Sequence, residues 1–331
     1  MDEQFLSALA EAQQPFADHR FQLCRLEATP SGDHYQLHGT VLDDATLTAV
    51  LDALRRQGPA ARWEHDGVRV LRGSHSRLMT AATNLTGLQR DPSWLGEQQS
   101  QVLGGTAVEV LEEAERWAFV RLEDGYLGWM YRGYLAEPAD VPTPTHQVGA
   151  PFTLVYATPN YLAPVVTRLF AGTRLAVGAL ENGWAPVQGV NGRGYADPMD
   201  LRPLEDKRPL DVRRRHLAHH DAMQYIGVPY LWGGTSVHGI DCSGFAQLMH
   251  RLAGVVIPRD ADRQYLAGQP VEPPFAPGDL FYFGGPGGHR AISHVGISLG
   301  TEMHPDGWAM IHSGRSRNGV YVDDVQAVAS L

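Results

Sequence analysis

Cysteine is scarce in this chain of 331 residues, which contains only Cys24 and Cys242. Two cysteines cannot form the several disulfides that hold small secreted scaffolds together, and they cannot supply a cysteine-rich zinc site. Cys24 lies in an alternating stretch with Phe21 and Leu23, which favours a buried apolar role for its thiol. The presence of Cys242 needs a different explanation.

Long apolar runs and excess basic charge are also lacking. No apolar stretch reaches the roughly 18 residues that a membrane-spanning helix needs. The chain has 27 basic and 37 acidic residues, and its net charge of −10 disfavours binding to the phosphate backbone of nucleic acids. The N-terminal residues lack a basic segment followed by a long apolar one. We therefore expect a cytoplasmic protein, or a secreted one if a signal peptide has been removed.

Glycine and proline are abundant, with 36 and 22 residues, and this predicts many turns and short strands. The length predicts two or three domains. Residues 1–75 are predicted to form a small α+β domain, to which the sequence assigns no function. In it, alternation over Tyr35–Val41 predicts a strand, the apolar spacing over Leu47–Leu54 predicts a helix, and Val68–Leu71 predicts a second strand.

A weak internal repeat follows the N-terminal domain. A Gly-Thr pair begins each copy, and Trp117 and Trp184 follow their pairs at the same spacing. Short alternating strands between these markers predict two tandem β-barrels, over residues 76–140 and 147–205. Two unrelated hairpin regions with chance spacing are the alternative. The segment Pro138–Pro151, with four prolines, is the predicted linker.

Residues 211–331 are predicted to form an α+β domain, with helices followed by four strands. Its strongest signal is a glycine-rich segment that ends at Asp241, a good helix N-cap, before a helix predicted over Cys242–Leu252. Cys242 then lies in the first turn of that helix. The positive end of the helix dipole favours the thiolate there, which is the reactive form of cysteine.

A catalytic thiolate needs an imidazole beside it, and His294 and His312 are the candidates. Each lies in a short apolar run that is predicted to be a strand. Adjacent antiparallel strands could place one histidine beside the other, so that one pairs with Cys242 and the second orients the first. Buried structural histidines are the alternative interpretation.

Six segments within residues 211–331 resemble, in order, the NlpC-type cell-wall cysteine peptidases. They are Pro229–Gly234, Asp241–Phe245, Pro258–Asp260, Pro277–Leu280, His294–Gly296 and Ile311–His312. The resemblance implies a papain-like fold with Cys242 as nucleophile, His294 as general base and His312 as the orienting residue. Tyr230 is implied to help hold the oxyanion. Such enzymes cleave amide bonds in peptidoglycan stem peptides, commonly between γ-D-glutamate and a diamino acid.

The two barrels resemble bacterial SH3-like domains, most clearly at Asp124–Met130. The combination resembles γ-D-glutamyl-L-diamino acid endopeptidases that recycle cell-wall peptides. In those enzymes the first SH3-like domain closes one end of the cleft, and only peptides with a free N-terminal L-Ala fit. The resemblance implies that Asp260, Glu97 and Tyr126 surround that ammonium group, which calls for carboxylates and an aromatic or hydroxyl group.

The same resemblance implies further cleft residues, namely Trp232, Asp241, Ser243 and Arg259. Arg259 is expected either to bind a substrate carboxylate or to form an internal ion pair with Asp260 or Asp262. A wall-binding protein that acts through its SH3-like modules, with a silent peptidase domain, is the alternative function. A different acyl-transfer reaction on the same fold is a third.

We expect murein peptides as substrates, with no cofactor and no metal ion. His216 and His220 have a zinc-like spacing, but no acid completes an HExxH motif, and Arg213–Arg215 would repel a cation. The sequence does not indicate the oligomeric state or which diamino acid is accepted.

Overall fold

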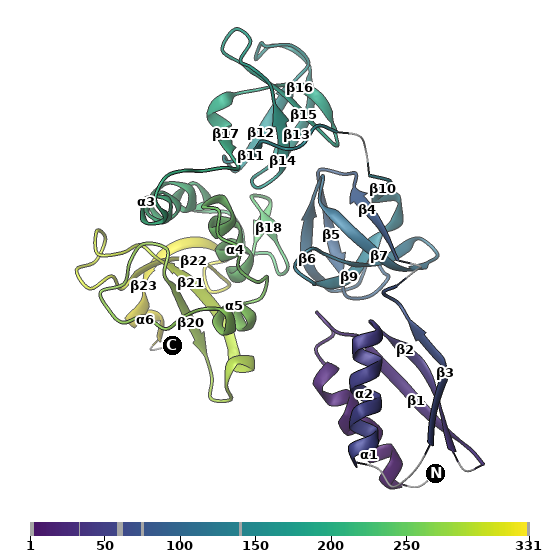
Figure 1. The fold of residues 1–331 in the computed structure, drawn as a ribbon. Coiled ribbons are helices and arrows are strands. Elements are labelled where there is room, and N and C mark those ends of the chain that lie inside the picture. The colour runs from purple at the N-terminus through teal and green to yellow at the C-terminus, as the bar shows by residue number, and fades with distance from the viewer. Residues whose placement is uncertain (1–2, 33, 58–61, 74–75, 139–140, 330–331) are drawn as a thin grey trace. The chain divides into compact units, whose positions relative to one another are not determined.

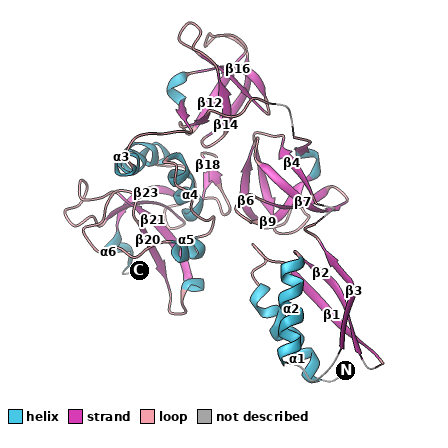
Figure 2. Ribbon diagram, in the orientation of Figure 1, coloured by secondary structure: helices cyan, strands magenta, loops and turns pink. Residues whose placement is uncertain are grey.

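The computed structural model of the protein describes residues 3–32, 34–57, 62–73, 76–138 and 141–329 (Figure 1). The chain divides into two compact units. One contains residues 1–79, 91–93 and 107–133, and the other contains residues 80–90, 94–106 and 134–331. Strands dominate the middle of the chain, and most of the helices lie in its first and last parts (Figure 2). Among the described residues, no helix combines the length and apolar character needed to span a bilayer.

The N-terminal domain is a three-stranded sheet packed against two helices (Figure 1). Its elements are α1 (Glu3–Gln13), a 3-10 turn (Gln14–Phe16), β1 (Cys24–Ser31), β2 (His34–Val41), α2 (Asp44–Gln57) and β3 (Arg62–Val70). The predicted strand, helix and second strand are confirmed as β2, α2 and β3, whereas α1 and β1 were not predicted. Asp43 caps α2 by accepting the Thr46 N–H at 2.9 Å. Leu37, Val50 and Leu54 lie in the shared core.

The first predicted barrel contains a seven-stranded sheet with strand order β10-β4-β7-β8-β9-β5-β6. Its elements are β4 (Arg77–Ala81), β5 (Leu85–Gln89), β6 (Gln98–Leu103), β7 (Ala107–Ala114), β8 (Trp117–Arg121), β9 (Leu127–Tyr131), a 3-10 turn (Arg132–Tyr134) and β10 (Leu135–Ala136). Strands β7, β8 and β9 form an antiparallel meander, and β5 pairs with β6. The alternating burial of these short strands is the pattern that the sequence predicted.

The second predicted barrel repeats this arrangement, with strand order β13-β12-β16-β15-β14-β11-β17. Its elements are β11 (His146–Val148), β12 (Phe152–Tyr156), β13 (Val165–Phe170), β14 (Arg174–Val177), β15 (Ala185–Gly189), β16 (Gly192–Ala196), a 3-10 turn (Pro198–Asp200) and β17 (Leu201–Pro203). Counting along the chain, each strand takes the same place in its sheet as its counterpart in the first barrel. The internal repeat is therefore structural, and the alternative of chance spacing is wrong.

The C-terminal domain places helices against a four-stranded antiparallel sheet of order β20-β21-β22-β23 (Figure 1). Its elements are α3 (Leu210–His216), a π-helical segment (Leu217–Asp221), a 3-10 segment (Ala222–Tyr225), β18 (Thr235–Ser236), β19 (Gly239–Ile240), α4 (Cys242–Leu252), α5 (Ala261–Ala267), β20 (Leu280–Gly284), a 3-10 turn (His289–Ala291), β21 (Ile292–Ser298), β22 (Ala309–Gly314), β23 (Gly319–Asp324) and α6 (Val325–Ala329). The helix predicted over Cys242–Leu252 is confirmed with those bounds as α4, and the four predicted strands are confirmed as β20 to β23. Apolar residues of α4 share one core with β21 and β22, so the first turn of α4 is fixed against the sheet.

Candidate active site

The start of α4 is defined by the side chain of Asp241. Its carboxylate accepts the N–H of Gly244 at 2.6 Å and that of Gly233 at 2.8 Å, so one residue caps the helix and holds the preceding loop. The loop backbone passes so close to the helix that a Cβ on Gly244 would lie 2.3 Å from the carbonyl oxygen of Gly234. The predicted N-cap is confirmed, and it fixes Cys242 as the first residue of the helix.

A buried ion pair supports this cap. Arg259, only 2 % exposed, donates to both carboxylate oxygens of Asp241, at 3.0 and 2.7 Å, and to the Ser243 hydroxyl at 3.0 Å. Its Nε donates to the Ser100 hydroxyl of β6 at 3.0 Å. From the sequence we expected Asp260, Asp262 or a substrate carboxylate as the partner of Arg259, and did not expect Asp241. That Arg259, Asp241 and Ser243 bind substrate stays a prediction, whereas their contacts with one another stabilise the loop that carries Cys242.

The thiol of Cys242 is buried, with 8 % of the residue exposed. Burial raises its pKa to about 11, and the neighbouring charge of Asp241 acts in the same direction. Backbone N–H groups of Val295 and Ser243 oppose this shift by hydrogen bonding to the sulfur. Desolvation therefore opposes the preference for the thiolate that the helix terminus provides, and the pKa of Cys242 is raised overall.

The two candidate histidines lie on neighbouring strands, as the sequence predicted. His294 Nε2 on β21 lies 2.6 Å from His312 Nδ1 on β22. Burial lowers the pKa of His294 to about 4, and the charges of His312 and Arg315 lower it further. Burial also lowers the pKa of His312. Both imidazoles are neutral at pH 7, so the pair can accept a proton.

The thiol and the histidine pair belong to one site. Val295, whose N–H reaches the Cys242 sulfur, is the residue that follows His294 on β21. Tyr230 is half-buried, and burial followed by the charge of Cys242 raises the pKa of its phenol to about 12. The phenol therefore stays protonated and can donate a hydrogen bond near the sulfur.

Asp323 is a residue of this site that the sequence analysis missed. Its Oδ2 lies 3.4 Å from His312 Nε2, on the side of the ring away from His294. Strand register explains the placement: His312 pairs with Tyr321, and side chains two residues apart on a strand share one face. The alternation Tyr321, Asp323 along the last predicted strand was the signal that could have identified it.

The structure brings two of the other predicted residues together. Trp232, 54 % exposed, donates its indole N–H to Glu97 Oε1 at 2.9 Å. Arg90 Nη1 lies 3.4 Å from the second carboxylate oxygen of Glu97. Glu97 thus lies against the loop before α4, in the same unit as Cys242. Asp260, partly buried, occupies the N-cap position of α5 in that unit.

Tyr126 belongs to the other compact unit. It is only 2 % exposed, and its ring lies edge-on to Phe21 with 5.2 Å between the ring centroids. Its backbone N–H donates to Asp124. A role for Tyr126 in substrate binding stays a prediction.

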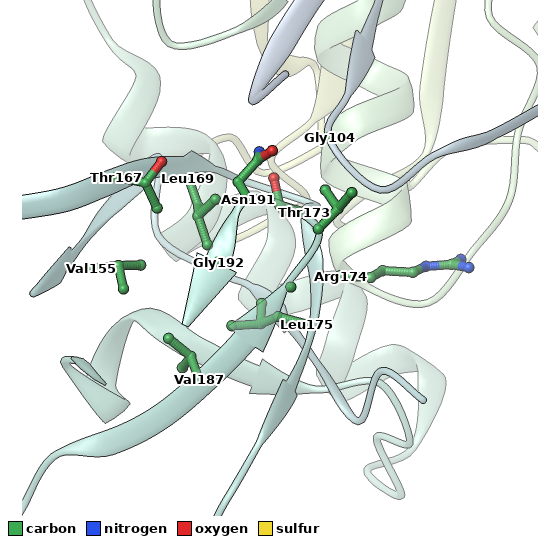
Figure 3. Close-up of a pocket in the computed structure, with 12 residues that line it drawn as sticks. Gly104, Val155, Thr167, Leu169, Thr173, Arg174, Leu175, Val187, Asn191 and Gly192 are labelled. Atoms are coloured by element: carbon green, nitrogen blue, oxygen red, sulfur yellow. The ribbon is translucent and has the colours of Figure 1, made fainter. Parts of the chain in front are cut away.

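A small cavity lies in the second barrel, beside Gly104 of the turn after β6 (Figure 3). Gly104, Val155, Leu169 and Asn191 are among the residues that line it, and its volume is about 10 Å³. That is room for about one water molecule, so this cavity is not a peptide site.

Three potential metal ligands also gather outside the site. Single donor atoms of His216, His220 and Asp221 lie within 4.8 Å of one another. However, Arg202 donates to both carboxylate oxygens of Asp221, each at 2.8 Å. The carboxylate charge is thus already paired, which disfavours a cation there. The absence of a metal stays a prediction.

Two family models and several known proteins are similar to this chain. Residues 227–329 match the model of the NlpC/P60 family, and residues 88–137 match the bacterial dipeptidyl-peptidase SH3 domain. The chain is 31 % identical over 239 residues to a gamma-D-glutamyl-L-lysine dipeptidyl-peptidase of Bacillus subtilis (strain 168), covering 68 % of this chain and 75 % of the relative. It is 28 % identical over 257 residues to dipeptidyl-peptidase 6 of Lysinibacillus sphaericus, covering 73 % and 89 %.

A solved structure shares the fold. An NlpC/P60 family protein from Bacillus cereus ATCC 10987 superposes with a TM-score of 0.64 at 22 % sequence identity. The match covers 75 % of this chain and 94 % of that protein, so it extends well beyond the C-terminal domain.

Proposed function

Because the chain belongs to the NlpC/P60 family of cysteine peptidases, we propose that it hydrolyses the γ-D-glutamyl-L-diamino acid bond of peptidoglycan stem peptides. The observation that carries the proposal is the histidine pair on β21 and β22, with 2.6 Å between the bonded nitrogens, next to the Cys242 thiol. The relatives named as dipeptidyl-peptidases support this peptidase activity over a wall-binding role.

The proton states of the site define the first step. A neutral Cys242 thiol faces a neutral imidazole, so the thiol proton passes to His294 as the sulfur attacks the γ-carbonyl carbon. The carbonyl oxygen becomes an oxyanion, for which the Cys242 N–H and the Tyr230 hydroxyl are the proposed donors. Thiolate and imidazolium then form only during attack.

Collapse of this intermediate breaks the C–N bond and leaves a thioester on Cys242. His294 gives its proton to the departing amine of the diamino acid, and water takes the place of that product. His294 then removes a proton from the water as the water attacks the thioester. The thiol is restored, and the glutamyl carboxylic acid is released.

We further propose that the substrate carries a free N-terminal L-Ala, bound by Glu97 with Asp260. In support, Glu97 is 44 % exposed, with Trp232 donating to one carboxylate oxygen at 2.9 Å and Arg90 farther away, at 3.4 Å from the other. Such a preference suits an enzyme that acts in the cytoplasm on released peptides. The net charge of −10 agrees with this, because a polyanionic wall would repel the chain.

Mass spectrometry tests the reaction. L-Ala-γ-D-Glu-diaminopimelate should yield two products whose summed mass exceeds the substrate by one water, whereas an acyl exchange would not add water. The same stem peptide joined to muramic acid, which lacks the free amine, should be left intact. Cys242→Ala should lower kcat at least ~10³-fold without loss of fold, because no other group supplies the nucleophile. Full activity in that variant, or no cleavage by the native protein, would refute the proposal.

The amine site is tested separately with Glu97→Gln. The glutamine carbonyl can still accept the Trp232 N–H, so the change removes mainly the negative charge. We expect KM for the free-amine peptide to rise about 10- to 100-fold, because a charge-assisted hydrogen bond is lost. Glu181→Gln on the second barrel, where Glu181 accepts from Tyr195, is the control. Equal KM values for both variants would remove Glu97 from the amine site.

A further inference from the structure

Asp323 is held firmly on β23. Its side chain is 18 % exposed, and Arg317 Nη2 donates to Oδ1 at 2.9 Å, which leaves Oδ2 facing His312. The Arg317 guanidinium lies over the Tyr321 ring at 4.5 Å, and that ring packs edge-on against His312 with centroids 4.5 Å apart. The carboxylate and the imidazole are therefore both oriented by neighbours.

The hydrogen bonds that join Asp323 to His312 and His312 to His294 determine where the protons lie. A carboxylate can only accept, so His312 must carry its proton on Nε2 to bond with Asp323. A neutral His312 then has a bare Nδ1, which accepts the proton on His294 Nε2. A neutral His294 with its proton on Nε2 has a bare Nδ1. A bare nitrogen is what a general base must offer to the thiol.

We propose that Asp323 is a positioning residue that fixes the tautomers of His312 and His294 and so keeps His294 able to accept the Cys242 proton. The inference rests on the peptidase mechanism proposed above and extends it by one residue. Asp323 acts through His312 and does not touch the reacting atoms. The interacting residues are then Cys242 of α4 and His294, His312 and Asp323 of three neighbouring strands, and Asp323 also forms an ion pair with Arg317.

Other charged groups face the pair and limit which variants are informative. Among the described residues, the groups that act on the two imidazoles are Arg315 and Arg317 of the β22–β23 turn and Tyr321 and Asp323 of β23. Tyr230 of the loop before β18 acts on Cys242 of α4. Of these, Asp323 is the group that accepts a hydrogen bond from His312, so changes there act on its tautomer most directly.

Asp323→Asn reverses the donors and acceptors in these hydrogen bonds while preserving the shape of the side chain. The amide can donate to His312 Nε2, which moves the His312 proton to Nδ1 and the His294 proton to its own Nδ1, so that His294 loses its free nitrogen. We expect kcat on the free-amine peptide to fall about 10- to 100-fold with little change in KM, as for other groups that orient a catalytic imidazole. Asp323→Glu, which restores an acceptor, should recover part of the rate.

Asp324→Asn is the matched control. It removes the same charge from the next residue, which is 47 % exposed and accepts the Gln326 N–H at the start of α6. We expect its kcat to stay within about twofold of the native value, since exposed charges contribute little. Equal losses in the two Asn variants, or no loss in either, would overturn the assignment.

Nitrogen-15 NMR of the histidines provides a readout that needs no substrate. In the native protein the proton should lie on Nε2 of both His294 and His312, and in Asp323→Asn it should lie on Nδ1 of both. Unchanged tautomers in a folded Asp323→Asn protein would refute the positioning role. A tautomer shift in a protein that cleaves no murein peptide would instead refute the proposed substrate and leave the role of Asp323 standing.

Discussion

At the scale of single residues, burial decides the chemistry of the site. Removal from water raises the pKa of the Cys242 thiol to about 11 and lowers the pKa of His294 to about 4. Both shifts favour the uncharged form. Burial therefore disfavours an ion pair of thiolate and imidazolium and favours a thiol beside a neutral imidazole.

These proton states predict an unusually acidic limit for activity. Loss of kcat/KM as the pH falls should follow protonation of His294, because an imidazolium cannot take the thiol proton. With a pKa of about 4, compared with an ordinary 6.5, activity should persist well below pH 6.5. A pH profile of kcat/KM on the free-amine peptide tests this. An acid limb near pH 6.5 would show that His294 is not desolvated in the free enzyme.

At the scale of secondary-structure elements, α4 depends on the buried pair between Arg259 and Asp241. The pair is almost fully buried, with 2 % and 8 % of the two side chains exposed, so neither charge is stabilised by water. Asp241 in turn holds the N–H groups of Gly233 and Gly244. The geometry around Cys242 therefore depends on a cation from the segment before α5.

Arg259→Met should destabilise the start of α4. It leaves the Asp241 carboxylate buried without its partner, and breaking such a pair costs about 3–5 kcal/mol. Hydrogen exchange of the α4 amides should accelerate accordingly. Asp241→Asn added to Arg259→Met should restore part of the protection, because the uncompensated charge is gone.

Arg55→Met provides the control for this measurement. Arg55 pairs with Asp52 on the exposed face of α2, where 69 % and 46 % of the two side chains are exposed. Loss of that pair should change stability by less than about 1 kcal/mol. If α4 exchanges at the native rate in Arg259→Met, the buried pair does not stabilise the helix.

The sequence predicted the elements whose residues repeat with a clear period. The helix α4 and the strands β20 to β23 lie where alternation, apolar spacing and the Asp241 cap placed them. The segment from Leu210 to Tyr225 is helical throughout but changes from α to π to 3-10 hydrogen bonding. Apolar periodicity cannot distinguish these bonding patterns over a few residues.

Features of the site that depend on three-dimensional contacts could not be predicted from the sequence. Residue type and spacing made Cys242, His294 and His312 candidates, and their individual roles came from the resemblance to the NlpC-type peptidases. The pairing of Arg259 with Asp241 was missed, because it joins two segments whose approach no local pattern records. The raised pKa of Cys242 could not be predicted either, since a helix terminus is visible in the sequence but the burial that opposes it is not.

At the scale of the whole molecule, one compact unit combines the β5–β6 hairpin, the second barrel and the peptidase domain. Side-chain hydrogen bonds of 2.8 to 3.0 Å connect these parts. They join Asn84 to Thr167, Glu97 to Trp232, Gln101 to Thr235 and Ser100 to Arg259. Three of the four bonds come from β6 or the residue before it, so this strand supports the catalytic loop as well as its own barrel.

The bond from Ser100 to Arg259 has a thermodynamic consequence. Arg259 also binds Asp241, so two bonds link a β6 hydroxyl to the helix cap beside the nucleophile. Coupling between two sites is reciprocal. If β6 stabilises the ordered loop, then a ligand that orders the loop stabilises β6 by the same free energy. Ligand binding at the active site and the stability of the SH3-like module would then be thermodynamically coupled.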